Sequence, residues 1–454
     1  MTAYVHIGTG KTGTTSIQAF LRKNEEGLHK QGIQSFVYCI TFETHRYDLT
    51  SLGGYGNLTA DKRIQMINAL KNKFQNYPYT KVIFSHEALQ GLFTSKKHII
   101  TFKQSLQDLG FNDFKIIVYL REPLDLAISI YGEIAKALFG RYANFNDENK
   151  CLEFGEHLCN HKQTLQWWSE VFGKENVIPR LFNKEDFIEG DLLKDFIFAL
   201  GLEWDSEFKI PGKLNETIDL LGIEVARGMG KLLCNRHGRG QYYCTLRERF
   251  TLTDKSLKYL PPKNVALKYL EYFAPSNEWV REHYFPHKKT LFPPKDMTNY
   301  KENNHLTTMK EEYWERIGGF IVDIVDSKNE MIKERDNQIK QQQFTLNYGT
   351  AQTRIQKQLT YQLGKALIEN SKSLLGFIRI PYVLSYIKEQ FQKELKTYQE
   401  KIKNNPNLKL PPLESYPDYK EALKLKNHLS YKLGEAILKA KSIGLLRGGE
   451  SICY

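Results

Sequence analysis

The residues HIGTGKTGTTS, at positions 6 to 16, combine the groups that bind oxyanions in proteins. An apolar run over residues 4 to 7 precedes this segment, and a helical pattern follows it. Backbone N–H groups of such a turn converge on an anion at the helix N-terminus. The sequence therefore predicts a phosphate-like site, built from glycines, a lysine and hydroxyl residues: Gly8, Gly10, Gly13, Lys11, Thr12, Thr14, Thr15 and Ser16.

The spacing of this loop separates it from two common nucleotide-binding loops. A Walker A loop, G-x-x-x-x-G-K-S/T, needs a glycine five residues before Gly10, where this chain has Val5. The dinucleotide fingerprint G-x-G-x-x-G can be fitted to the glycines, but Lys11 lies inside it. No suitable strand ending in an acidic residue follows about 20 residues later. The loop therefore fits neither an ordinary NTPase nor a dinucleotide-binding enzyme.

A second phosphate-binding pair is predicted in KIIVYLREPLDLAISIYGE, residues 115 to 133. Arg121 follows an apolar strand-like run, and Ser129 lies on the helix that is expected next. A guanidinium can bind a phosphate through two parallel hydrogen bonds, and a hydroxyl can add a third. Alternatively, Arg121 forms an ion pair with Glu122 or Asp125.

A candidate base lies in VIFSHEAL, residues 82 to 89. Ser85, His86 and Glu87 come directly after a predicted parallel strand, at the edge where ligands of open α/β folds collect. Neighbouring residues leave a strand in opposite directions, so we expect one of His86 and Glu87 to face a ligand. A structural hydrogen bond or a helix cap is the alternative for each.

Lys11-Thr12-Gly13-Thr14-Thr15-Ser16 resembles the 5′-phosphosulfate loop of sulfotransferases that use 3′-phosphoadenosine 5′-phosphosulfate (PAPS). The family signature reads roughly P-K-S/T-G-T-T, and here Gly10 replaces the proline. Arg121 and Ser129 match the spacing of the family's 3′-phosphate site. FAPSNEWVREHYFPHKKTLF (273 to 292) and KLNETI (213 to 218) resemble further segments of bacterial carbohydrate-type members. The resemblance covers about residues 1 to 295.

This resemblance implies a P-loop-like enzyme that moves a sulfuryl group from PAPS to a carbohydrate hydroxyl, without a metal. It implies that Lys11 stabilises the leaving 5′-phosphate and that the loop and the Arg121/Ser129 pair bind the donor. Family members use a histidine or a glutamate as the base, and bacterial members often show S-x-E. Glu87 is therefore preferred slightly over His86. Bacterial surface polysaccharide, or its lipid-linked precursor, is the expected acceptor.

The coarse pattern of the chain predicts an α/β fold with a parallel sheet. Short buried strands are expected at residues 4 to 7, 82 to 85 and 115 to 120, with helices at 16 to 23 and 62 to 74 between them. VIPRLF is a further strand candidate, and residues 215 to 330 have mainly helical patterns. We expect a P-loop-NTPase-like domain over residues 1 to 320, a helical linker over 321 to 350 and a helical tail over 351 to 454.

The tail contains an internal repeat. KQLTYQLGKALIENSKSLLG (357 to 376) is echoed by NHLSYKLGEAILKAKSIGLL (427 to 446), with apolar residues on one helical face beside lysines. These amphipathic segments pack on the rest of the protein, or they contact a membrane surface or a protein partner. They resemble segments at the ends of some bacterial surface-polysaccharide transferases. In the linker, Val325, Ile332, Ile339 and Leu346 recur every seven residues, but their companion positions are polar, so they make at most half of a coiled-coil seam. A long exposed helix or linker is therefore predicted there.

The net charge of +12 predicts attraction to anions in general, and so leaves two other functions open. One is a nucleotide-dependent kinase or NTPase; the other is a basic, non-enzymatic protein that binds nucleic acid or a membrane surface. Nucleic acid is not an expected partner, because the chain lacks RNP-like and helix-turn-helix patterns. Scattered cysteines, the lack of a signal peptide and the lack of a long apolar run predict a cytoplasmic protein, which can be peripheral on the inner membrane.

Weaker candidates for the acceptor site are His45, Arg46 and a basic cluster of six residues. The cluster consists of Lys231, Arg236, His237, Arg239, Arg247 and Arg249.

Overall fold

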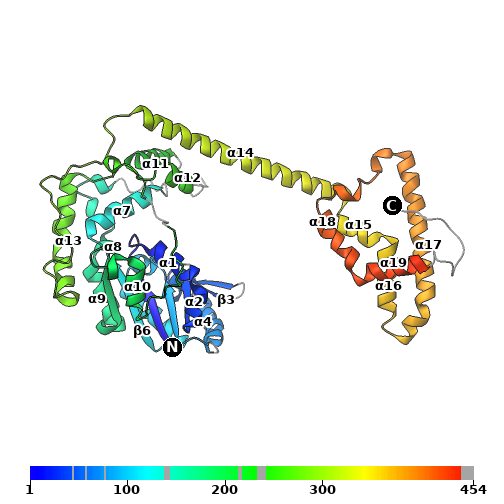
Figure 1. The fold of residues 1–454 in the computed structure, drawn as a ribbon, viewed down its shortest axis with the longest axis horizontal. Coiled ribbons are helices and arrows are strands. Elements are labelled where there is room, and N and C mark those ends of the chain that lie inside the picture. The colour runs from blue at the N-terminus through cyan, green and yellow to red at the C-terminus, as the bar shows by residue number, and fades with distance from the viewer. Residues whose placement is uncertain are drawn as a thin grey trace. The chain divides into compact units, whose positions relative to one another are not determined.

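The structure is a computed structural model that describes residues 1–42, 45–56, 59–75, 78–136, 144–212, 217–232 and 242–440. The chain forms two compact units, Met1–Ile324 and Val325–Tyr454. The boundary between them falls inside one long helix, α14 (Glu311–Tyr348; Figure 1).

The first unit is built on a five-stranded sheet in the order β2-β5-β1-β6-β7. All four strand pairs are parallel. Helices lie on both faces of this sheet, so the α/β fold class is confirmed. The strands are β1 (Thr2–His6), β2 (Ile33–Val37), β5 (Lys81–Ser85), β6 (Asp113–Leu120) and β7 (Val177–Leu181).

Each face of the sheet packs against its own helices. On one face, side chains such as Ile83 and Ile117 pack against α1 (Thr14–Lys23), α2 (Glu25–Lys30) and α10 (Leu192–Ala199). On the other face, side chains such as Val5 and Val118 pack against α4 (Ala60–Gln75), α6 (Lys96–Asp108) and α9 (His161–Phe172). The alternation of side chains along each strand thus feeds two buried cores, as is usual for a parallel sheet.

A separate helical core completes the first unit. It is formed by α7 (Pro123–Lys136), α11 (Leu220–Leu232), α12 (Tyr243–Arg249) and α13 (Lys263–Tyr284), with Tyr313 and Phe320 from the start of α14. Shorter elements are α3 (Leu49–Leu52), α5 (Ala88–Leu92), α8 (Glu156–Cys159) and an antiparallel pair, β3 (Cys39–Phe42) and β4 (His45–Asp48).

Most of the expected elements are present. The three expected strands correspond to β1, β5 and β6, VIPRLF contains β7, and the two expected helices correspond to α1 and α4. Strand β2 was not expected. Its sequence, IQSFV, contains two polar residues, and Gln34 and Ser35 are nevertheless buried beside β5. Burial of polar residues at a sheet edge depends on the neighbouring elements, which a local pattern does not record.

The second unit is helical: α15 (Ala351–Lys357), α16 (Leu359–Asn370), α17 (Leu374–Asn404), α18 (Tyr419–Ala422) and α19 (Leu429–Ala440). The spaced residues of α14 are exposed, from 48% for Ile339 to 84% for Leu346. This agrees with the expected long exposed helix. No helix among the described residues is long and apolar enough to cross a membrane.

The two copies of the repeat pack against each other. Helices α16 and α19 cross at Gly364 and Gly434, which occupy the same position in the two copies. A Cβ atom on Gly364 would lie 1.7 Å from the carbonyl oxygen of Ser430, and one on Gly434 would lie 1.7 Å from that of Thr360. Because Thr360 and Ser430 are also equivalent, the contact is reciprocal. The tail repeat is thus a pseudo-two-fold helix pair in which small residues allow close backbone approach.

We expect Gly364→Ala to loosen this pair, because a methyl group cannot fit against the opposing backbone. Amide hydrogen exchange in α16 and α19 should become faster by at least tenfold, which corresponds to about 1.4 kcal/mol of opening free energy. The matched control is Gly318→Ala in α14, where a Cβ would meet nothing within 4 Å. That change should leave exchange in the tail unaltered. Unchanged exchange in Gly364→Ala would contradict the described crossing.

Candidate anion-binding site

The predicted site residues lie at the carboxyl ends of three adjacent strands, β5, β1 and β6. His6 of β1 is in register with Ser85 of β5 and with Ile117 of β6. The glycine loop therefore follows β1 between the segment that begins at His86 and the segment that begins at Arg121. Carboxyl ends of parallel strands are where open α/β folds bind ligands.

The loop that follows β1 presents a row of backbone N–H groups. Thr9 still donates to the carbonyl of Tyr119 at 3.2 Å, and hydrogen bonding to Gly13 resumes at Ser16. Between these points, the N–H groups of residues 10 to 15 have no acceptor among the residues that the structure describes. Together with the N-terminal end of the α1 dipole, these N–H groups are donors that an anion could accept from.

The backbone of the loop has a positive φ at three positions, the first of which is Gly8 with φ 111°. Gly13, the N-cap of α1, has φ 74°, and a Cβ there would lie 2.2 Å from Cδ2 of Leu192. Lys11 has φ 66°, which is uncommon for a residue other than glycine. Such conformations gather at ligand-binding sites, where the surrounding structure holds them in place.

The hydroxyl groups of the loop differ in what they can offer a ligand. Thr12 is fully buried and donates to the carbonyl of Thr9 at 2.5 Å, so its hydroxyl holds the loop closed. Thr14 is also buried, whereas Thr15 and Ser16 are half-buried. Thr15 and Ser16 therefore have the more accessible hydroxyl groups.

Arg121 is tied directly to the loop. Its Nη1 atom donates to the carbonyl oxygen of Lys11 at 2.9 Å, and its guanidinium lies 5.7 Å from the ring centre of Phe182. The buried His161 donates from Nε2 to the carbonyl of Arg121 at 2.6 Å. Burial lowers the pKa of Arg121, although the nearby Asp125 and Glu122 oppose this. The two predicted phosphate-binding segments are therefore joined by a hydrogen bond.

A cluster of charges surrounds Glu133, two helical turns beyond Asp125 on α7. Lys11 and Lys136 both approach its Oε2 atom, at 2.7 and 2.8 Å, and Tyr243 of α12 donates to its Oε1 atom. Ser129 is half-buried and lies one turn before Glu133 on the same helical face. The helix thus brings Ser129 to the side on which Lys11 lies.

The pKa values in this cluster follow from burial and charge. Burial by itself would raise the pKa of Glu133, but Lys11 and Lys136 outweigh it and lower that pKa to about 2. Burial lowers the pKa of Lys136, against the attraction of Glu133. Burial and the hydrogen bond to Glu133 raise the pKa of Tyr243. Glu133 is therefore ionised at neutral pH and forms an ion pair with the ammonium group of Lys11.

His86 and Glu87 have different surroundings. His86 accepts a hydrogen bond at Nδ1 from the N–H of Ala88 at 3.2 Å, and its Nε2 lies 3.8 Å from Oδ1 of Asp48. Burial lowers the pKa of His86 despite the nearby carboxylates. Glu87 accepts from Nε2 of Gln18, on α1, at 2.5 Å. Glu87 is the N-cap residue of α5, yet its side chain makes no capping hydrogen bond.

The structure also reveals site residues that the sequence did not identify: Gln18, Glu133, Lys136, His161 and Tyr243. For Glu133 and Lys136 a signal was present, because they continue the helical face of Ser129 at the spacing of one turn. His161 and Tyr243 come from other elements, and no local pattern marks them. Arg236, His237 and Arg239 lie outside the described residues, as do the side chains of His45 and Arg46. Arg249 pairs with Asp323, away from this cluster.

His6 is a buried histidine directly before the loop. Its Nδ1 atom shares a hydrogen bond with Oγ of Ser85 at 2.8 Å, and burial lowers its pKa to about 3. It is therefore neutral at physiological pH and joins the ends of β1 and β5. Across the described parts of the chain, no group of three or more His, Cys, Asp or Glu residues is arranged to hold a metal ion.

Comparison with known proteins gives three findings. A family profile described as "Domain of unknown function (DUF8374)" matches residues 284–449. An uncharacterized protein of Archaeoglobus fulgidus is 27% identical over 196 residues, which are 42% of this chain and 52% of the relative. The chain thus spans about half the length of the curated relative it matches.

The third finding is a solved structure, a sulfotransferase from Alicyclobacillus acidocaldarius. It is 18% identical, with a TM-score of 0.29, and the match covers 47% of this chain and 85% of that chain. At these values the likeness adds nothing to the α/β fold that the sheet itself defines.

An arriving anion must compete with Glu133 for Lys11. We therefore expect Glu133→Gln to raise the affinity for inorganic sulfate, whose charge is the same at pH 6 and pH 8, by about two- to fivefold, the range of a partly exposed ion pair. Because the pKa of Glu133 is about 2, the gain should be equal at pH 6 and pH 8. Titration calorimetry at each pH measures the affinity of the parent and of the variant. Glu170→Gln removes the same charge from a surface pair with Lys96 and should change little; an equal gain there would disprove a local effect.

Proposed function

We propose that this protein is a PAPS-dependent sulfotransferase that acts on a carbohydrate hydroxyl, of a bacterial surface polysaccharide or its precursor. The observation that carries the proposal is the hydrogen bond between Arg121 and the carbonyl of Lys11. It joins an anion-binding loop to a second cationic group, as a donor with phosphates at two positions requires. The resemblance of both segments to the family's signature supplies the identity of that donor.

The residues of the site fit such a donor. The unpaired N–H groups of residues 10 to 15, with Thr15 and Ser16, would hold the 5′-phosphosulfate, and Arg121 and Ser129 would hold the 3′-phosphate. In the reaction, a bond forms between the acceptor oxygen and sulfur while the bond from sulfur to the 5′-phosphate oxygen breaks. Lys11 would stabilise the charge that develops on the leaving phosphate.

Glu87 is the base that the surroundings favour. Because Nδ1 of His86 accepts from Ala88, the proton of the neutral ring is on Nε2. Neither nitrogen of His86 can then readily take a proton from an acceptor. Glu87 uses one oxygen for Gln18 and makes no helix cap, so a carboxylate oxygen remains to accept the proton of the hydroxyl.

The donor assignment is tested by titration with 3′-phosphoadenosine 5′-phosphate, against ADP and ATP, with a chelator present. We expect tighter binding of the 3′-phosphorylated nucleotide. Lys11→Ala and Arg121→Ala should each weaken it by about 10- to 100-fold, since each removes charge-assisted hydrogen bonds. Arg121→Lys, which keeps the charge, should recover part of the loss. Lys96→Ala, on the surface, is the control.

Two results would contradict the donor assignment. Equal affinity for ADP would mean that the loop holds a nucleotide without a 3′-phosphate, as a kinase or NTPase does. Binding of nucleic acid with no nucleotide preference would mean that the basic charge serves a non-enzymatic role.

The base is tested with isosteric changes. Glu87→Gln should lower kcat by about 10²- to 10⁴-fold, with nucleotide affinity within a few-fold of the parent, because the amide cannot accept the proton. His86→Asn keeps an acceptor for the N–H of Ala88 and should lower kcat by less than about tenfold. Both values of kcat are measured as sulfate transfer from radiolabelled PAPS. A larger loss in His86→Asn than in Glu87→Gln would assign the base to His86.

A further inference from the structure

The second unit exposes an apolar stripe on helix α17. Six large apolar or aromatic side chains there are more than half exposed: Leu374 at 83%, Leu375 at 70%, Phe377 at 65%, Ile378 at 63%, Tyr382 at 78% and Tyr386 at 62%. Leu374, Ile378, Tyr382 and Tyr386 follow one another at intervals of four, so they lie along one side of the helix. We call these six residues the α17 stripe.

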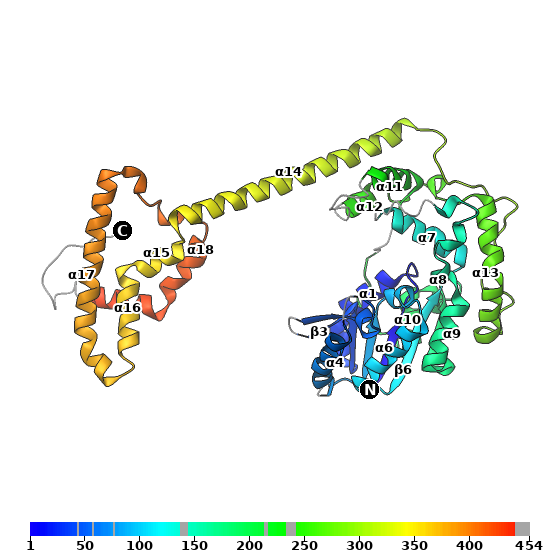
Figure 2. The ribbon, with the colours of Figure 1, turned by 180° about the vertical axis from the view of Figure 1, so that it is seen from behind.

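The opposite side of this part of α17 is already in use. Ile380, Val383, Leu384 and Ile387 are half-buried, and α17 contacts α16, which runs beside it (Figures 1 and 2). The helix is thus apolar on two sides, although packing within the unit covers one of them. Isolated exposed apolar residues are ordinary, but a continuous group marks a surface that binds a partner.

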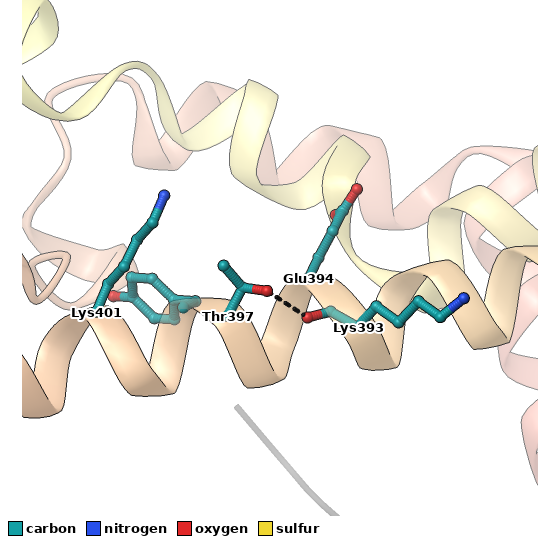
Figure 3. Close-up of a pocket in the computed structure, with 5 residues that line it drawn as sticks. Lys393, Glu394, Thr397 and Lys401 are labelled. Carbon is teal, nitrogen blue, oxygen red and sulfur yellow. Dashed lines mark hydrogen bonds between the residues drawn. The ribbon is translucent and has the colours of Figure 1, made fainter.

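The charges beside the stripe have one sign. Residues 371 to 388 include Lys372, Arg379 and Lys388 and contain no acidic residue. The C-terminal half of the same helix is different, because acids and bases alternate there. Its shallow hollow is lined by Lys393, Glu394, Thr397, Tyr398 and Lys401, and Thr397 Oγ1 donates to the carbonyl of Lys393 at 2.9 Å (Figure 3). That half is a solvated surface, and the apolar, basic half is distinct from it.

We propose that the α17 stripe binds an anionic membrane surface, with the helix lying in the plane of the lipid headgroups. Leucine, isoleucine and phenylalanine side chains would enter the acyl boundary. Tyr382 and Tyr386 would remain at headgroup depth, where amphipathic rings are favoured. Lys372 and Arg379 would contact lipid phosphates. The binding is peripheral, because no described helix can span a bilayer.

Charge favours lipid over a second copy of this chain. Two α17 stripes packed face to face would bring Lys372 and Arg379 of one chain near those of the other, with no acidic residue of the segment between them. Anionic headgroups neutralise the same charges. Of the described residues in the two repeat segments, only Leu374 and Leu375, near the end of the first copy, belong to the α17 stripe. Helices α16 and α19 use Gly364 and Gly434 to pack on each other, whereas the exposed apolar surface belongs to α17.

The test is sedimentation of the full chain with large unilamellar vesicles. We expect binding to vesicles of phosphatidylethanolamine and phosphatidylglycerol (3:1), weaker binding at 0.5 M salt, and little binding to pure phosphatidylcholine. The triple variant Leu374→Gln, Ile378→Gln and Tyr382→Gln should lose at least tenfold in vesicle affinity. Arg379→Glu should weaken binding to the anionic vesicles.

The matched control changes three exposed apolar residues of α14 in the same way: Ile332→Gln, Ile339→Gln and Leu346→Gln. This control should bind as the parent does, and circular dichroism should show that both variants keep their helices. Three results would overturn the proposal: no binding of the parent to anionic vesicles, equal losses in the two triple variants, or lipid-free self-association that only the α17 variant abolishes. The last result would assign the stripe to a dimer. None of these outcomes depends on nucleotide binding.

Discussion

The structure of the first unit is organised around backbone N–H groups that have no acceptor within the described protein. The amides of residues 10 to 15 belong to the loop after the central strand β1 and the first residues of α1, where the helix dipole adds to their partial charge. An unpaired donor is costly unless water or a ligand satisfies it. A negatively charged ligand could accept from several such donors at once, and the nearby cations of Lys11 and Arg121 would favour the same kind of ligand.

The parallel sheet is what gathers these groups. Strands β5, β1 and β6 are adjacent, so their carboxyl ends deliver Glu87, the glycine loop and Arg121 to one edge. The contacts between them are short and specific: Gln18 to Glu87, and Arg121 to the carbonyl of Lys11. Each of these bonds joins the segment that follows β1 to the segment that follows a neighbouring strand. A ligand bound here would meet groups whose positions are set by the sheet and not by a mobile loop alone.

In two places, groups that could contact a ligand or a partner instead contact other residues of the same chain. Glu133 holds the ammonium of Lys11, so the loop's cation is neutralised within the protein and must be released to act on a ligand. In the tail, the repeated helices α16 and α19 cover each other, which leaves α17 as the helix with an unpaired apolar side.

The sequence by itself determined the α/β class, the strand, loop and helix from Tyr4 to Lys23, the strands that end before His86 and Arg121, and the tail repeat. These follow from local periodicity and from glycine and proline chemistry, which act over a few residues. Only the tertiary structure decided strand β2, the partners His161 and Tyr243, the different hydrogen-bond partners of His86 and Glu87, and the contact of Gly364 with Ser430. Each depends on atoms far apart in the chain, whose contacts the order of residues does not contain.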